Sequence, residues 1–263
     1  MKDRVLSGVT LVAFFMAIVV FNRSFPLALN IAIAFISALA VFEVIKALGL
    51  SDRWYITVPS MTAAVLVQFC EFQQANIFIY SAFTACIFCA LLRHHREITF
   101  KEMAVVYSMV VLIPLALQTI VLVRTLSDQH GMFYALVCVF SAWIPDAGAF
   151  FAGKLFGKHK LCPEISPKKT VEGAIGGLLG GDIGMTVLKL VAVSMAHTLT
   201  VYPPIEMAAG PQITWGAVFA LGIIGSTISQ IGDLSFSVIQ REFAVMDYGT
   251  PLPGPGSLLD TFS

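Results

Sequence analysis

Apolar residues fill stretches of about 20 positions along most of the chain, and polar residues are largely confined to the short segments between them. A helix needs about 20 apolar residues to cross a hydrocarbon core of roughly 30 Å. The pattern therefore predicts an all-α, polytopic integral membrane protein with about eight transmembrane helices. The candidate spans cover residues 6–22, 26–47, 56–74, 76–92, 103–124, 132–152, 171–196 and 213–240.

The composition supports a membrane location. Hydrophobic residues make up 57% of the 263 positions and charged residues only 12%, whereas soluble domains carry about 25% charged residues. The mean hydropathy of +0.85 agrees with this. The formal net charge is zero, which argues against a basic nucleic-acid-binding protein and predicts no nucleic-acid partner.

The lysines and arginines predict the orientation. With the N-terminus in the cytoplasm and eight crossings, only Arg23 and Arg124 fall outside, and Lys189 falls within a span. The inside positions are Lys2, Arg4, Lys46, Arg53, Arg93, Arg96, Lys101, Lys154, Lys158, Lys160, Lys168, Lys169 and Arg241. Such a bias is typical of cytoplasmic loops, so we expect a cytoplasmic N-terminus.

Two polar segments stand out from the turn-length connections, and both are expected on the cytoplasmic side. Residues 153–170 form a basic loop punctuated by glycine and proline, and residues 241–263 are rich in both. Prolines at this density disfavour helix and strand alike. We therefore divide the chain into N-terminal transmembrane helices (1–130) and a C-terminal catalytic region (131–263).

Ionisable residues inside the spans are candidates for function, because each costs at least ~2.5–3.5 kcal/mol on insertion scales. Glu43 and Lys189 lie near helix ends, from which their side chains are expected to reach the interface. Asp182 follows Gly180 and Gly181, so it is expected to face a polar seam between closely packed helices. The remaining two are Asp146 and Asp233.

Asp146 and Asp233 have the surroundings expected of cation or substrate ligands. Asp146 lies just before the basic loop, and Asp233 follows Ser229-Gln230 in a span rich in hydroxyl groups. Mg²⁺ prefers one or two carboxylates together with water and substrate phosphates. The alternative for each residue is a buried aspartate that is hydrogen-bonded to serine or threonine.

The basic loop has the groups that bind a phosphate. Lys168 and Lys169 precede an expected helix whose N-terminus Ser166 or Thr170 can cap, and Glu172 can reinforce that cap. Free amides and the helix dipole favour an anion at such a terminus. The alternative is an ordinary topogenic loop followed by an ordinary helix cap.

Two motifs carry a family resemblance. Residues 146–177 open with D-x-G-A-x-F-A-G and close with S-P-K-K-T-x-E-G-x-x-G-G, while S-Q-x-G-D stands at 229–233. The C-terminal stretch 237–263 is similar to the signature S-x-x-K-R-x(4)-K-D-x-G-x(2)-[LIF]-P-G-H-G-G-x-x-D-R-x-D. Together these motifs resemble the phosphatidate cytidylyltransferase (CDP-diacylglycerol synthase) family.

The resemblance implies an enzyme of phospholipid biosynthesis in the cytoplasmic membrane of a bacterium. It would transfer a cytidylyl group from CTP to the membrane lipid phosphatidate, releasing pyrophosphate, and it would form a homodimer. Mg²⁺ is the implied cofactor, with K⁺ as a candidate second cation. The implied catalytic residues are Asp233, Asp260 and Lys168.

The resemblance also assigns roles to individual residues. The metal ligands would be Asp233, Asp260 and Asp247. Phosphate would be bound by Lys168, Lys169 and Arg241, Asp146 would organise the polar cavity, and the basic loop would be shaped by Ser166, Thr170 and Glu172.

The chain also departs from the family signature, which leaves alternatives open. The departures are Gln240, Met246, Pro255, Ser257, Thr261 and Ser263, and the family's further transmembrane helix does not follow in this sequence. One alternative is a catalytically impaired or truncated relative that retains the fold. Another is a polytopic transporter coupled to cations or protons, in which the intramembrane acids form a relay.

Overall fold

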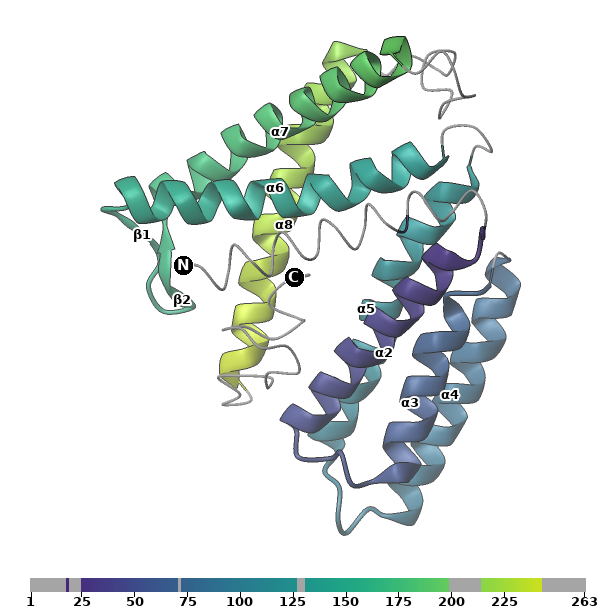
Figure 1. The fold of residues 1–263 in the computed structure, drawn as a ribbon. Coiled ribbons are helices and arrows are strands. Elements are labelled where there is room, and N and C mark those ends of the chain that lie inside the picture. Colours follow the sequence, from purple (N-terminus) through teal and green to yellow (C-terminus); the bar gives the residue numbers. More distant parts are fainter. Residues whose placement is uncertain (1–17, 19–24, 71, 127–130, 199–213, 243–263) are drawn as a thin grey trace. The chain divides into compact units, whose positions relative to one another are not determined.

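The computed structural model describes residues 18, 25–70, 72–126, 131–198 and 214–242. They form seven helices and one short β-hairpin, which confirms the prediction of an all-α polytopic membrane protein (Figure 1). The helices are α2 (Ala28–Ala47), α3 (Trp54–Val67), α4 (Gln73–Arg93), α5 (Phe100–Thr125), α6 (Gly131–Phe156), α7 (Val171–Thr198) and α8 (Trp215–Glu242). The strands are β1 (Lys160–Cys162) and β2 (Ser166–Thr170).

The chain divides into two compact units, with the boundary between Leu122 and Val123. Among the described residues, the first unit holds α2 to α5 and the second holds α6, the hairpin, α7 and α8. That the C-terminal region 131–263 is the catalytic one stays a prediction, because compactness does not report on chemistry.

Six of the described helices are long and apolar enough to cross a membrane. They correspond to six of the eight expected spans, all except the first and the third. The first, 6–22, lies outside the described residues apart from Ile18. The third, expected over 56–74, is wrong in extent because α3 ends at Val67 after 14 residues. At 1.5 Å per residue, α3 is about 21 Å long.

Buried amide side chains explain how α3 ends early. The side-chain amide of Gln118, from α5, donates to the carbonyl oxygens of Val67 at 2.8 Å and of Cys70 at 2.9 Å. Asn30, from α2, donates to the carbonyl of Gln68 at 2.9 Å. Helix ends leave carbonyls without intrahelical partners, and irregular backbone at membrane depth is tolerated only where the protein satisfies it. These amides replace the missing helical turn.

The core of the first unit is apolar and draws on all four of its helices. Its buried members include Val41, Ile56, Phe83 and Val106, one from each helix. Glu43, also on α2, is buried with 3% of its surface exposed. The expectation that Glu43 reaches the interface is therefore wrong, because α2 is packed on most sides and its side chain is enclosed.

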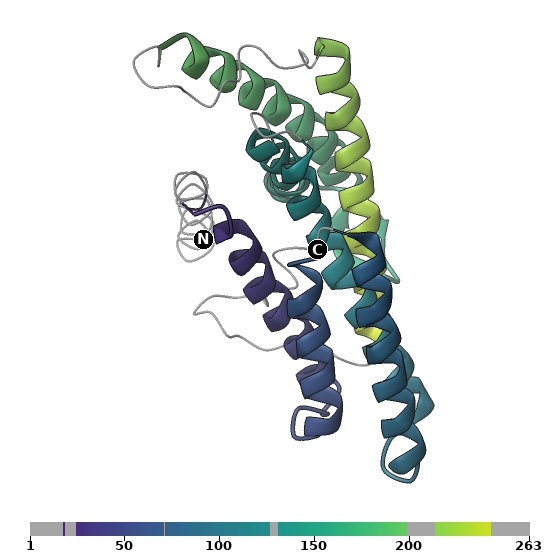
Figure 2. The same ribbon diagram turned by 90° about the vertical axis from the view of Figure 1, so that its right-hand side faces the viewer.

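Glycines set the packing of the second unit. A Cβ atom on Gly148 of α6 would lie 2.7 Å from the carbonyl oxygen of Gly176 and 3.2 Å from Cα of Gly180, both on α7. The two backbones therefore touch directly, as glycine allows in membrane helices. Helices α6 and α7 lie closest at the end that carries the hairpin, and α8 crosses both (Figures 1 and 2).

Asp182 lies in a seam between α7 and α8, as predicted. Its Oδ1 atom is buried against Gly222, where an added Cβ would collide with the carboxylate. On the same seam, the hydroxyl of the fully buried Ser226 lies against Gly181. Glycines on each helix thus make room for a polar side chain of the other.

We expect Gln118→Leu to destabilise the protein, because the carbonyls of Val67 and Cys70 lose their donor at membrane depth. An unsatisfied buried group costs roughly 1–3 kcal/mol. Thermal unfolding of the detergent-solubilised chain measures this as a lowered Tm. Thr119→Val is the control, since the Thr119 hydroxyl is exposed and bonds only within its own helix, to Ala116. Equal Tm values for the two variants would contradict this role of Gln118.

We expect Gly148→Ala to destabilise the second unit and Gly216→Ala to leave it unchanged or slightly more stable. A methyl group at Gly148 meets the backbone of α7, whereas at Gly216 it meets nothing within 4 Å. Overpacking costs about 1–3 kcal/mol, while alanine in an open helical position gains up to about 1 kcal/mol over glycine. Unfolding midpoints of both variants test the difference, and a Gly148→Ala protein as stable as Gly216→Ala would refute it.

Candidate functional site

Helix α8 has one polar face. Ser226, Gln230, Asp233 and Ser237 recur at intervals of three or four residues, so they share one side of the helix. Ile228, on the other side, is 63% exposed and is suited to contact lipid. Helix α8 is therefore amphipathic although it lies within the membrane, and its polar face is where chemistry can occur.

This polar face is turned toward α6 and α7. The Ser229 hydroxyl donates to the carbonyl of Ala142 on α6 at 3.4 Å. The Gln230 side chain donates to the carbonyl of Ala174 on α7 at 3.1 Å. Both bonds join α8 to a neighbouring helix one turn or less before Asp233, so they fix the backbone position from which that carboxylate projects.

The basic loop is more ordered than the sequence indicates. Residues 153–156 continue α6, and residues 160–170 form an antiparallel hairpin in which Lys160 pairs with Thr170 and Cys162 pairs with Ser166. A three-residue turn, 163–165, connects the strands. The register shifts between these two pairs, so Lys168 and Lys169 lie in the irregular part of β2, directly before α7.

Thr170 caps α7, as predicted for either Thr170 or Ser166. Its hydroxyl accepts a hydrogen bond from the Gly173 amide at 3.1 Å, while Ser166 belongs to the strand pairing. The Val171 amide donates to the carbonyl of His159 at 2.9 Å. Because both amides are bonded inside the protein, the lysines are better placed than the helix terminus to bind a phosphate.

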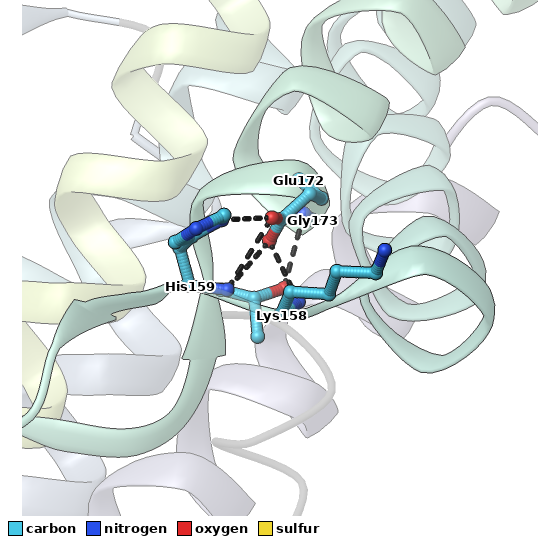
Figure 3. A network of polar contacts seen from close by, with 5 residues as sticks. Lys158, His159, Glu172 and Gly173 are labelled. Atoms are coloured by element: carbon cyan, nitrogen blue, oxygen red, sulfur yellow. Dashed lines mark hydrogen bonds and ion pairs between the residues drawn. The ribbon is translucent and has the colours of Figure 1, made fainter.

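Glu172 ties the start of the hairpin to α7 (Figure 3). Its carboxylate accepts hydrogen bonds from the backbone amides of Lys158 at 3.1 Å and of His159 at 3.2 Å. The Nδ1 atom of His159 lies 2.6 Å from Glu172 Oε1. Glu172 lies in the first turn of α7, as expected of a residue that reinforces the cap, and its carboxylate also reaches across to the hairpin, which the sequence did not predict.

The hairpin brings Lys169 to Asp233. The ammonium group of Lys169 forms an ion pair with Oδ2 of Asp233, and the two side chains are 23% and 37% exposed. Lys168, the preceding residue, is exposed. The structure thus joins two of the predicted site residues, Lys169 and Asp233.

The other predicted site residues are placed only in part. Asp146 is exposed on α6. Asp247 and Asp260 lie outside the described residues, as does the side chain of Arg241. Lys189 was expected to reach the interface. Its amine lies 3.9 Å from the centre of the Trp215 ring, and tryptophan is enriched at membrane interfaces.

Asp233 can supply one carboxylate ligand to a cation. The carboxylate already neutralises one positive group, the ammonium of Lys169, and remains partly accessible. Within the described ranges, no group of three or more His, Cys, Asp or Glu side chains is close enough to hold a metal ion. The predicted ligands Asp247 and Asp260 lie outside those ranges, and water and substrate phosphates commonly complete the coordination of Mg²⁺.

Comparison with known sequences decides the family. The model of the Cytidylyltransferase family matches residues 2–263. The chain belongs to this family.

Bacterial relatives in the cytidylyltransferase family share substantial identity with the chain. A phosphatidate cytidylyltransferase of Bacillus subtilis (strain 168) is 28% identical over 273 residues, which cover 100% of this chain and 92% of the relative. The phosphatidate cytidylyltransferase of Staphylococcus aureus (strain COL) is 37% identical over 134 residues, 51% of this chain and 45% of that protein. The same values hold for the phosphatidate cytidylyltransferase of Staphylococcus haemolyticus (strain JCSC1435).

His159 and Gln230 have no role predicted from the sequence, yet their hydrogen bonds connect parts of the candidate site. Gln230 stands in the S-Q-x-G-D motif and His159 stands between two lysines of the basic loop. The sequence held a signal for Gln230, because a lone amide on an intramembrane helix face needs a partner. It held none for His159, because the imidazole lies opposite Glu172 only once the loop folds back.

We expect Glu172→Ala to loosen the hairpin more than His159→Ala does. Loss of the carboxylate removes the acceptor for two backbone amides and the imidazole, whereas loss of the imidazole leaves both amide bonds in place. Hydrogen exchange at the amides of Lys158 and His159 measures the effect, with the amides of α6 as an internal reference. Equal exchange rates in the two variants would show that the imidazole, rather than the backbone bonds, holds the hairpin.

Proposed function

We propose that this chain is a phosphatidate cytidylyltransferase, which converts CTP and phosphatidate into CDP-diacylglycerol and pyrophosphate. The observation that carries the proposal is the ion pair between Lys169 and Asp233, in the C-terminal half of α8, in a chain of this family. The names of the bacterial relatives support the same activity. They also support a bacterial cytoplasmic membrane as the location.

The reaction joins two anions, so positive groups must neutralise them. A phosphate oxygen of phosphatidate attacks the α-phosphorus of CTP; a new P–O bond forms, and the bond to the pyrophosphate leaving group breaks. Such transfers depend on alignment and charge neutralisation. Lys169 and Lys168 would bind phosphate oxygens from β2, and Arg241 would do so from the end of α8.

The acidic residues would serve a metal cofactor. A bound Mg²⁺ would neutralise charge on the phosphates, with K⁺ as a candidate second cation. Asp233, Asp247 and Asp260 would be the ligands, and Asp146 would line the polar cavity. Metal dependence itself is part of the proposal and is tested with it.

The position of the site suits a reaction between a lipid and a soluble nucleotide. The positive-inside distribution of lysine and arginine predicts that the hairpin faces the cytoplasm, where CTP is available. Phosphatidate stays in the bilayer and would bring its headgroup sideways to Asp233 on α8. The family resemblance further suggests a homodimer, which chemical crosslinking in membranes would detect.

We expect the purified full chain to form CDP-diacylglycerol from radiolabelled CTP, phosphatidate and Mg²⁺. Asp233→Asn should lose at least about 100-fold in rate, because a ligand charge is removed from the phosphate-binding region. Lys169→Gln should lose about 10- to 100-fold, the equivalent of one charge-assisted contact of about 1.5–3 kcal/mol. Thin-layer separation of the labelled lipid provides the measurement.

A control variant and one further outcome complete this test. Glu97→Gln removes an exposed ion pair with Arg53 in the first unit and should keep wild-type activity. If no labelled lipid forms with any divalent metal while CTP still binds, the chain is a catalytically impaired relative instead. The substituted signature positions, among them Gln240 and Met246, are the observation that favours this second reading.

A further inference from the structure

Resting on the proposed function, we infer that Lys169 acts as an internal stand-in for the metal ion at Asp233, so that divalent cation and nucleotide phosphate bind cooperatively. The two side chains form an ion pair with each other. A ligand for either one must therefore break that pair before it binds.

The backbones on each side of the ion pair are fixed, whereas the lysine side chain is not. Asp233 follows Gln230, which is bonded to α7, and Lys169 precedes Thr170, which pairs with Lys160 and caps α7. Lysine has a flexible stem of four carbons. The ammonium group can therefore leave Asp233 by side-chain rotation, with no shift of the hairpin or of α8.

The pair is placed to be exchanged rather than to hold the fold. Both side chains are partly exposed, at 23% and 37%, so the protein does not enclose the pair. Exposed pairs are weak, and partial burial at the membrane raises the strength of this one only moderately. A ligand of ordinary affinity can therefore displace either partner.

Cooperativity follows from counting how often the pair must be broken. A cation that binds Asp233 alone bears the full cost of releasing Lys169, and a phosphate that binds Lys169 alone bears the same cost. When both bind, the cost is met once, so each ligand tightens the other by the same factor. From the strength of partly exposed pairs, that factor is roughly three- to fivefold.

The consequence for the reaction is a preference for the metal–nucleotide complex over either component. Bare cation meets a carboxylate that is already neutralised, and free phosphate meets a lysine that is already neutralised. A complex that carries both charges satisfies Asp233 and Lys169 in one step. The site would thereby discriminate against inorganic phosphate and unbound metal.

The metal arm of the test uses Mn²⁺ alone with the full chain in detergent, its binding followed by electron paramagnetic resonance of the free ion. Lys169→Gln should bind Mn²⁺ about three- to fivefold more tightly than the matched control Lys168→Gln. Both variants lose one positive charge from the same strand, but only Lys169 contacts Asp233. Lys169→Arg keeps the pair and should show no gain.

The nucleotide arm uses CTP in the presence of EDTA, with binding followed by calorimetry. Asp233→Asn frees Lys169 and should tighten metal-free CTP binding about three- to fivefold over wild type. The same substitution in a Lys169→Gln background should give no gain, because no lysine is released. This double-mutant cycle separates the ion pair from the general loss of negative charge.

Each outcome decides the inference. Equal Mn²⁺ affinities for Lys169→Gln and Lys168→Gln, or a CTP gain from Asp233→Asn that persists without Lys169, would overturn it. An Asp233→Asn variant that binds Mn²⁺ as tightly as the wild-type chain would overturn it as well. These binding measurements do not require turnover, so they can succeed in a chain that forms no CDP-diacylglycerol, and the two proposals can fail separately.

Discussion

The hydrocarbon core offers no hydrogen-bond partner, so every polar group that enters it must be satisfied by the protein itself. This constraint explains where several of the described polar side chains are placed. The carbonyls at the end of α3 are bonded by Gln118 and Asn30, and the amide of Gln230 is bonded to α7. Polar groups therefore gather where helices meet, and those meeting points fix where the helices can end or bend.

The same constraint locates the site. Helix α8 presents isoleucines to the lipid and a row of polar side chains to its neighbours, and the glycines of α6 and α7 bring their backbones close enough to receive it. Toward the predicted cytoplasmic end this row reaches Asp233, where the hairpin supplies Lys169. The charge of Asp233 is thus tolerated because a cationic group meets it.

Much of this could be predicted from sequence because it depends on local patterns. Apolar stretch length predicts the long helices, the glycine pair before Asp182 predicts a packed seam, and Thr170 before an apolar run predicts a cap. The failures share a cause, since each depends on a distant partner. The early end of α3 requires Gln118, the reach of Glu172 requires the folded hairpin, and the burial of Glu43 requires the packing around α2.

The hairpin is held at two points that differ in kind. At one point, Glu172 accepts bonds from two backbone amides and lies against the His159 imidazole. Its partners cannot leave unless the backbone moves. At the other, a single flexible ammonium group meets Asp233, and a competing charge can replace it. A site that must hold its shape while it exchanges ligands needs both kinds of contact. This difference is the physical reason to assign Glu172 to structure and Lys169 to binding.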